Sequence, residues 1–160
     1  MSMQPRIKSP AMTLPGAMEA IMKLVKLVEK SGVPPATIEF TNMRASQING
    51  CSVCVDIHSR ALKHLGEKDE RIFSISAWRD APYYSDAERA ALALAEAATR
   101  LEDRANPVPD EIWKEAARHY NETAISALVM SIGVINLWNR VNVTTRQVSG
   151  EWTAQYAQPR

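Results

Sequence analysis

The sequence of 160 residues has only two cysteines and almost no net charge. A formal net charge of +1 argues against a nucleic-acid-binding surface, which needs clustered lysine and arginine. No apolar run approaches the roughly 18 residues of a membrane span, and the first fourteen residues lack the apolar stretch of a signal peptide. We therefore expect a soluble, cytoplasmic protein that binds neither nucleic acid nor a membrane.

Strand-like alternation of apolar and polar residues is also missing, and the apolar spacing is helical nearly throughout. The 46% of apolar residues suffices for a core. Together these features predict an all-α fold, a helical bundle of six to eight helices. We expect one domain over residues 1–160, with the first fourteen residues and the tail after Gln147 as extensions. Four helices are predicted over 15–32, 34–50, 51–65 and 68–78. Three more are predicted to begin after a capping box at 85–88, at about residue 110 and after Asn121.

The two cysteines are close together, with Cys51 three residues before Cys54, and His58 follows four residues later. A disulfide between them would close a very small loop and would constrain the unfolded chain little. Disulfides are also rare in a reducing compartment. The pair is therefore better explained by catalysis or metal binding than by a structural cross-link.

On a helix, which advances about 100° per residue, Cys51 and Cys54 are roughly 60° apart and His58 lies within about 40° of either. All three share one face with apolar side chains, so we expect the thiols at the floor of a pocket. The helix start after Gly50 lowers the pKa of a thiol at Cys51. His58, one turn beyond Cys54, can take a proton from a thiol. These two features activate different sulfurs, and the order of attack stays open.

Other roles for the two cysteines and His58 are also open. A structural zinc site needs four ligands, and only Cys51, Cys54 and His58 have a recognisable spacing. An open three-ligand zinc site, a pair of buried structural cysteines, and a protein that uses its pocket or faces for binding or assembly remain alternatives. Covalent haem attachment requires His directly after the second cysteine, where this chain has Val55.

Three segments of the chain resemble a known family: ASQINGCSVCVDIHSRALKHLGE, AWRDAPYYSDAERAALALAEAAT and INLWNRVNV. They are similar to the carboxymuconolactone decarboxylase-like superfamily and, within it, to alkylhydroperoxidase D-like (AhpD-like) proteins. Glu39 stands twelve residues before Cys51, where that family has its glutamate. The resemblance implies the all-α AhpD-like fold, a homo-oligomer that is commonly a trimer or hexamer, and a thiol peroxidase that needs no cofactor.

By this resemblance Cys54 matches the peroxidatic cysteine and Cys51 the resolving cysteine, while Glu39 and His58 match the proton relay. The better-known members have a second histidine between the cysteines, where this chain has Val53. The expected function is therefore a thiol-dependent hydroperoxide reductase supplied by an external dithiol or thiol protein. The alternative is a dithiol–disulfide oxidoreductase or redox sensor that does not reduce peroxides. Trp78, Trp138, Asn139 and Arg140 are predicted to be packing or interface residues.

Overall fold

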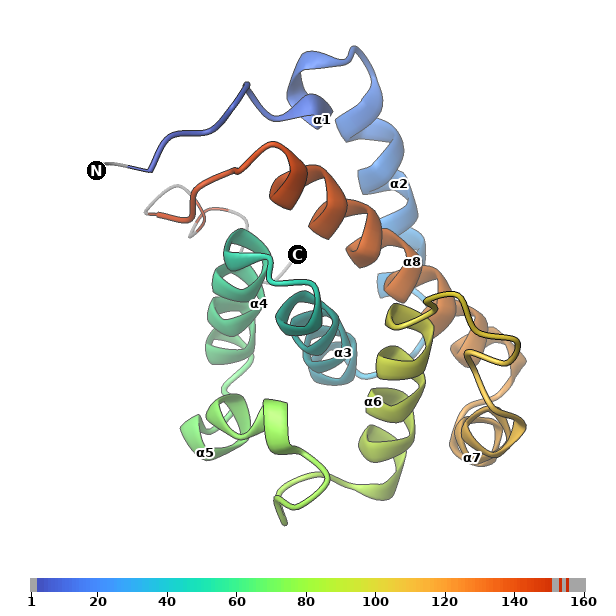
Figure 1. Ribbon diagram of the computed structural model, residues 1–160. Helices are drawn as coiled ribbons and strands as arrows, with labels where there is room; N and C mark the ends of the chain where they lie inside the picture. Colours follow the sequence, from blue (N-terminus) through green and yellow to red (C-terminus); the bar gives the residue numbers. More distant parts are fainter. Residues whose placement is uncertain (1–2, 151–152, 154, 156–160) are drawn as a thin grey trace.

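The computed structural model describes residues 3–150, 153 and 155, which form eight α-helices, one short 3₁₀ helix and no strand (Figure 1). The prediction of an all-α bundle of six to eight helices is therefore confirmed. The elements in chain order are α1 (Pro10–Thr13), α2 (Ala17–Glu29), α3 (Pro35–Ile48), α4 (Ser52–His64), α5 (Asp69–Phe73), η1 (Ile75–Ala77), α6 (Asp86–Thr99), α7 (Asp110–His119) and α8 (Glu122–Thr144).

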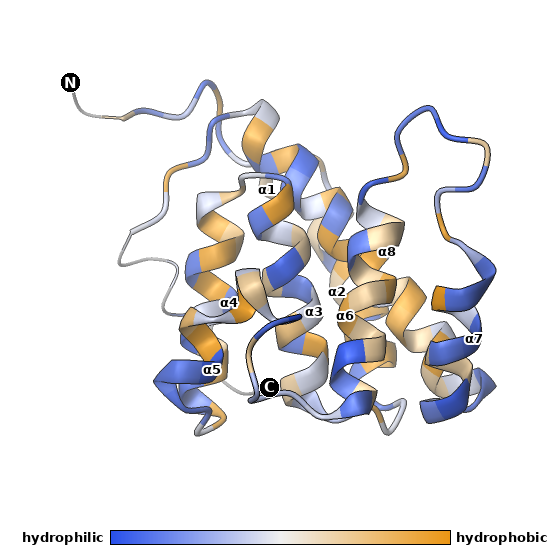
Figure 2. Cartoon of the chain, turned by 60° about the horizontal axis from the view of Figure 1, so that its bottom comes forward, coloured by the Kyte–Doolittle hydropathy of each residue, from blue (hydrophilic) through white to orange (hydrophobic). Residues whose placement is uncertain are grey.

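Helix α3 occupies the centre of the bundle and packs against α4, α6 and α8 (Figure 1). Helix α2 lies along α8, and α7 packs against α6 and α8 at the edge of the molecule. Figure 2 shows that α7 and the loop before it are mostly hydrophilic, whereas α6 and α8 are mostly apolar. The largest buried cluster accordingly joins side chains from α6 and α8, such as Leu94 and Leu128, with Ile38 of α3.

The predicted caps at the starts of α6 and α8 are present. Ser85 and Glu88 form the capping box of α6, and the Asn121 side chain accepts a hydrogen bond from the Ala124 N–H at the start of α8. The helix predicted over residues 68–78 is instead two short pieces, α5 and η1, which meet at Ser74. Helix α8 continues through Gly133 without interruption.

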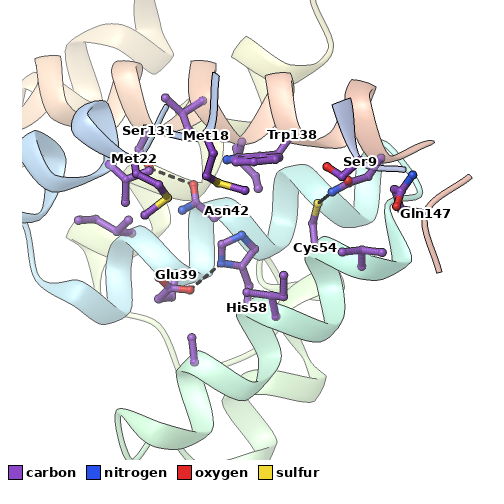
Figure 3. Close-up of a pocket in the computed structure, with 18 of the residues that line it drawn as sticks. Ser9, Met18, Met22, Glu39, Asn42, Cys54, His58, Ser131, Trp138 and Gln147 are labelled. Carbon is purple, nitrogen blue, oxygen red and sulfur yellow. Dashed lines mark hydrogen bonds and ion pairs between the residues drawn. The ribbon is translucent and has the colours of Figure 1, made fainter. Parts of the chain in front are cut away.

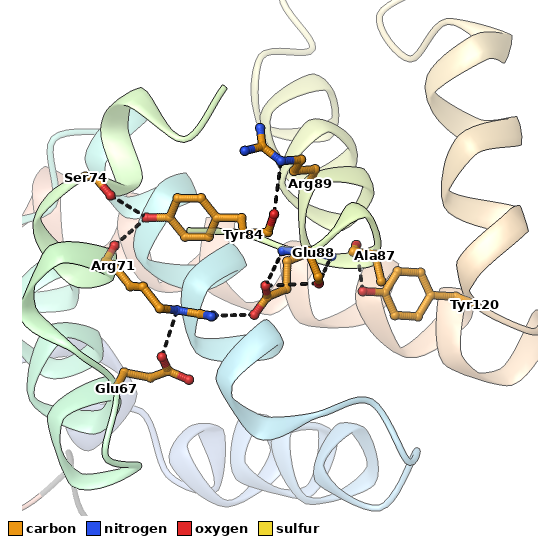
Figure 4. A network of polar contacts seen from close by, with 9 residues as sticks. Glu67, Arg71, Ser74, Tyr84, Ala87, Glu88, Arg89 and Tyr120 are labelled. Atoms are coloured by element: carbon orange, nitrogen blue, oxygen red, sulfur yellow. Dashed lines mark hydrogen bonds and ion pairs between the residues drawn. The ribbon is translucent and has the colours of Figure 1, made fainter. Parts of the chain in front are cut away.

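Polar contacts anchor this short-helix region to α6 (Figure 4). Arg71 of α5 forms an ion pair with Glu67 at 2.9 Å and another with Glu88 of α6. The Tyr84 hydroxyl lies 3.0 Å from the Ser74 hydroxyl and donates to the Arg71 carbonyl. Because these contacts tie the break at Ser74 to the N-terminus of α6, the chain turns there instead of continuing as one helix.

Helix α8 has the length and apolar composition to cross a membrane, which the sequence analysis did not anticipate. Its position explains the composition, because it packs against α2, α3 and α6 along its length. It also buries polar side chains, Asn139 and Asn142, that hydrogen-bond within the protein. These are the features of the core helix of a helical bundle.

The N-terminal residues are tied to the end of α8. The Arg6 N–H donates to the Thr145 carbonyl, the Arg6 guanidinium donates to the Thr144 carbonyl, and the Gln147 amide donates to the Ile7 carbonyl, each at 2.9 Å. We call residues 5–13, which include α1, the N-terminal strap. The division into one domain with two extensions stays a prediction. Within the predicted C-terminal extension, residues 151–152, 154 and 156–160 lie outside the described residues.

Candidate active site

The turn between α3 and α4 positions the two cysteines. Gly50 has a φ of 68°, a left-handed conformation that glycine adopts without strain, and it lets the chain reverse between the helices. Cys51 is the N-cap of α4, and its sulfur accepts the Cys54 N–H at 3.3 Å. Cys51 therefore stands one position before the helix. The spacing predicts it in the first turn of the helix, and that prediction is wrong. Both residues are buried, with 1% and 3% of their surfaces exposed.

The two thiols differ in their pKa values. Hydrogen bonds from the Cys54 side chain and N–H, with help from Asn142 and Asn139, outweigh burial and lower the pKa of Cys51 to about 7. The hydrogen bond from Cys54 to the Cys51 sulfur raises the pKa of Cys54, and burial and the charge of the Cys51 thiolate raise it further. Cys51 is thus the sulfur that ionises first, and it accepts a hydrogen bond from the Cys54 thiol.

Glu39 and His58 form the second part of the site. The His58 Nδ1 lies 2.6 Å from the Glu39 carboxylate, which joins α3 to α4. The side chains of Glu39 and His58 are 23% and 13% exposed, so neither points into bulk solvent. In the described part of the chain, no hydrogen bond joins His58 to either sulfur. Its ring stands one helical turn from Cys54 on the same cavity wall (Figure 3).

Asparagines of α8 complete the surroundings of the sulfurs. The Asn142 amide donates to the Cys54 sulfur at 3.4 Å. Asn139, 1% exposed, donates to the Ser46 hydroxyl at 3.0 Å and accepts from the Asn49 amide at 2.8 Å. The two hydrogen bonds of Asn139 fix the orientation of its amide, because its donor and its acceptor both have a partner. The prediction of Asn139 as a packing residue missed these hydrogen bonds.

One cavity of about 1140 Å³ connects these groups (Figure 3). Cys54, Glu39 and His58 line it, as does Trp138, which the sequence analysis took for a packing or interface residue. Cys51 is not among the lining residues, so only one of the thiols stands at the cavity surface as predicted. Most of the remaining wall is apolar, with contributions from α2, α3, α4 and α8 and from the N-terminal strap.

The structure offers little support for a metal site. Among the described residues, no group of three His, Cys, Asp or Glu side chains gathers closely enough to hold a metal ion. His119 pairs with Glu115 on α7, and His64 does not line the cavity. The four candidate residues Glu39, Cys51, Cys54 and His58 do come together, at the interface of α3 and α4.

The sequence model of the carboxymuconolactone decarboxylase family matches residues 15–97, more than half of the chain. The chain belongs to this family. The matched region of this family member contains all four candidate residues, but neither the N-terminal strap nor Asn142.

Relatives and solved structures agree with this assignment. The uncharacterized protein YdfG of Bacillus subtilis (strain 168) is 36% identical over 129 residues, which cover 81% of this chain and 86% of YdfG. Alkyl hydroperoxide reductase AhpD of Solibacter usitatus is 34% identical over 59 residues, 37% of this chain and 33% of that protein. The structure of ATU0492 from Agrobacterium tumefaciens superposes with a TM-score of 0.85 at 34% identity, covering 92% of this chain and 99% of that one. ATU0492 is a protein of unknown function that has been suggested to be an antioxidant defence protein AhpD. The family member described here therefore has the AhpD-like fold.

Two features of the site were not predicted from the sequence. Asn142 and the N-terminal strap lie far from the cysteines along the chain. The available signal for Asn142 was the recurrence of asparagine at 139 and 142, three residues apart on an otherwise apolar helix, where a buried polar side chain needs a partner.

Proposed function

We propose that this protein is a thiol-dependent hydroperoxide reductase in antioxidant defence. One observation carries the proposal: Cys54 lines a cavity that it shares with the Glu39–His58 pair, and Cys51, the more acidic thiol, contacts Cys54 at the start of α4. A nucleophilic sulfur, a proton acceptor and a proton donor are thus arranged around one space. The similarity to AhpD of Solibacter usitatus supports the same reaction class.

In the first step the Cys54 sulfur attacks the terminal oxygen of the hydroperoxide. The Cys54 proton passes to the Cys51 thiolate, with which it is already hydrogen-bonded. An S–O bond forms, the O–O bond breaks, and the sulfur is oxidised to a sulfenic acid. The leaving alkoxide takes a proton from the imidazolium of His58 and departs as an alcohol. The Glu39 carboxylate stabilises the positive charge of that imidazolium before the proton leaves.

In the second step Cys51 attacks the oxidised Cys54 sulfur. An S–S bond forms, the S–O bond breaks, and hydroxide leaves with the Cys51 proton as water. The spacing of the two residues across the first turn of α4 already brings the Cys51 sulfur to the Cys54 N–H. An external dithiol then reduces the disulfide by exchange, which returns two electrons and two protons and restores the Cys54 thiol, the Cys51 thiolate and the protonated His58.

Asn142 has a role in the first step. Its amide donates to the Cys54 sulfur, where negative charge develops as the proton moves to Cys51. Hydrogen bonds to a charged group are stronger than those to a neutral one, so this contact favours the attacking state over the resting thiol. Asn142 therefore stabilises the negative charge on the Cys54 sulfur during the attack.

Peroxide consumption by the purified protein with a dithiol reductant tests the proposal. Cys54→Ser is expected to abolish turnover. Cys51→Ser should still release about one equivalent of alcohol per chain, but more slowly, because the group that takes the Cys54 proton is missing. The reaction should then stop at the sulfenic acid, which a dimedone label detects. If Cys54→Ser consumes peroxide as fast as the wild type, this mechanism is wrong.

A second candidate function is thiol–disulfide exchange without peroxide reduction. It is favoured by the low pKa of Cys51 at a helix N-terminus, which is typical of exchange-active thiols, and by Val53 in place of a second histidine. The second-order rate constant of thiol oxidation by peroxide separates the two functions. A rate constant no greater than that of a free thiol, combined with fast reduction of the disulfide by dithiols, would favour exchange.

The partners and compartment follow from the same chemistry and are also proposals. The substrate is a hydroperoxide, the reductant an external dithiol or thiol protein, and the compartment the reducing cytoplasm. We propose a homo-oligomer, a trimer or a hexamer, because α2 and α8 leave large apolar side chains exposed. These are Leu24, Leu27, Val129, Met130, Leu137 and Val143. Light scattering of the purified protein would show a mass of three or six chains, and a monomer would contradict this.

A further inference from the structure

The cavity is far larger than hydrogen peroxide requires. Its 1140 Å³ exceeds the upper end of the usual range for pockets that hold drug-sized ligands. Its lining runs from Met18 to Glu29 on α2 and from Ser131 to Asn142 on α8. At about 1.5 Å per residue, each of these walls is roughly 16 Å long. Since α2 and α8 lie side by side, the cavity is elongated (Figure 1).

The two ends of this cavity differ in charge. At one end Lys8 and Ser9 of the strap and Gln147 line it, and in Figure 3 Ser9 and Gln147 lie at the same end of the view as Cys54. The described residues 3–14 and 136–150 contain four arginines or lysines and no Asp or Glu. At the other end lie Glu39 and Glu29, the last residue of α2. An anionic group is therefore favoured only at the Lys8 end.

The wall between the two ends is apolar. Met18, Met22 and Val25 of α2 and Ile135 and Trp138 of α8 line this part of the cavity. Flexible methionine side chains adapt to ligands of varying shape, so this wall can pack against a long hydrocarbon chain. The carboxylate of α4 nearest to Cys54 in sequence, Asp56, is bound by Arg60 and Thr153 and does not line the cavity.

From this arrangement we infer that the substrate is an amphipathic, long-chain hydroperoxide with an anionic head group such as a carboxylate. The head group lies at Lys8, the hydroperoxyl group at Cys54, and the apolar tail along α2. Lys8 is thus a specificity-determining residue contributed by the strap, outside the region that the family shares. The inference rests on the proposed function for the reaction itself, but the binding site can be tested without it.

Binding is tested with oleate and with oleyl alcohol, which has the same chain and no charge. Trp138 lines the cavity, so oleate should change its fluorescence, and Trp138→Phe should lose that signal. Lys8→Glu is expected to weaken oleate binding about fivefold, the effect of one solvent-exposed charge pair. It should leave oleyl alcohol unaffected. The matched control is Lys26→Glu, which changes an exposed lysine of α2 that does not line the cavity.

The binding site is wrong if oleate fails to bind, if Trp138→Phe keeps the signal, or if Lys8→Glu and Lys26→Glu act alike. Failure to bind together with a chain that associates over this face would mean that a second copy covers the cavity. Circular dichroism melting of the Lys8→Glu variant shows whether it is folded, and unchanged oleyl alcohol binding gives the same check at the cavity itself.

Turnover is tested with linoleic acid hydroperoxide, its methyl ester and hydrogen peroxide. We expect the highest kcat/KM for the acid, and in Lys8→Glu a KM about fivefold higher for the acid alone, with kcat unchanged. Oleate binding without reduction of any hydroperoxide would overturn the proposed function and leave the acyl site standing. Reduction of hydrogen peroxide without oleate binding would overturn the acyl site and leave the proposed function standing.

Discussion

Two glutamates of this protein, Glu39 and Glu96, are both held by basic side chains but differ in what those side chains can do. Glu96 of α6 is 3% exposed and accepts from Arg44 at 2.6 Å, Arg79 at 2.6 Å and Arg100 at 2.9 Å. The Trp78 indole N–H adds a hydrogen bond of 3.1 Å. Glu39 has one partner, His58, beside an open cavity.

The partner side chains decide which carboxylate can take part in proton transfer. Arginine stays protonated at any physiological pH, so Glu96 is locked in an ion-pair cluster that ties α6 to α3 and to the segment after η1. Burial raises the pKa of Glu96, but the hydrogen bonds from the arginines and Trp78 outweigh it and lower the pKa to about 2. Histidine gains and loses a proton near neutral pH, so the Glu39–His58 pair can pass a proton to a substrate.

The largest effect is expected on stability, from Glu96→Gln. Removal of this charge leaves Arg44, whose side chain is only 13% exposed, without its counter-ion. Breaking a buried ion pair from one side typically costs several kcal/mol, and we expect the free energy of unfolding to fall by about 3 kcal/mol. Urea denaturation measures it. Glu39→Gln is the matched control, expected to cost less than about 1 kcal/mol. Equal losses in the two variants would remove the distinction between these glutamates.

The same Glu39→Gln change should act on activity instead. Gln retains an acceptor for the His58 Nδ1 but loses the charge that stabilises the imidazolium. We expect kcat/KM for hydroperoxide to fall about 100-fold, the usual contribution of a positioned acid–base group. Steady-state kinetics over pH 5–9 measures this. Glu96→Gln, assayed at a temperature where it is folded, should stay within about threefold of the wild type. A larger drop would give Glu96 a part in the reaction.

A third prediction concerns acid. The pKa of Glu96 is about 2 in the folded protein against an ordinary value of 4.5. A depressed pKa contributes stability above 4.5, and this contribution is lost as pH falls towards 2. We expect Glu96 to account for about 2 kcal/mol of the stability lost between pH 6 and pH 3. Urea denaturation of the wild type and Glu96→Gln should therefore converge over this range. Parallel pH dependences would show that the Glu96 pKa is ordinary.

The sequence predicted the local part of the site better than its long-range part. Cys54 and His58 share a face because one helix places residues four apart together, a rule that needs no tertiary information. Glu39 was found through the family resemblance, since the crossing of α3 and α4 that brings it to His58 is not encoded in either helix alone. Its contact with His58 is what separates it from an ordinary exposed glutamate.

Contacts between distant segments could not be predicted in this way. Asn142 is 88 residues from Cys54, and its donor reaches the sulfur only because α8 crosses the α3–α4 turn. The strap became a cavity wall through hydrogen bonds to the end of α8, whose partners are backbone carbonyls and therefore leave no mark in the residue types. The sequence predicts Cys51 as the first residue of the helix, whereas it is the N-cap. Residue spacing along the chain does not distinguish a cap from the first residue of a helix.

The smallest expected effect concerns Asn142, a neutral hydrogen-bond donor. It tests whether Asn142 takes part in the reaction, like Glu39, or only in stability, like Glu96. Asn142→Ala removes one hydrogen bond to the Cys54 sulfur, worth about 1 kcal/mol, so we expect kcat/KM to fall about fivefold. Because Asn142 also helps to lower the pKa of Cys51, the pH at which Cys51 is half-alkylated by iodoacetamide should rise above 7. The matched control is Asn49→Ala, which removes donors to Asn136 and Asn139 but none to a sulfur. It should reduce stability and leave the alkylation profile nearly unchanged. If both variants lose stability and neither shifts the profile, Asn142 is a structural residue like Glu96, and the chemistry rests on Glu39, His58 and the two thiols alone.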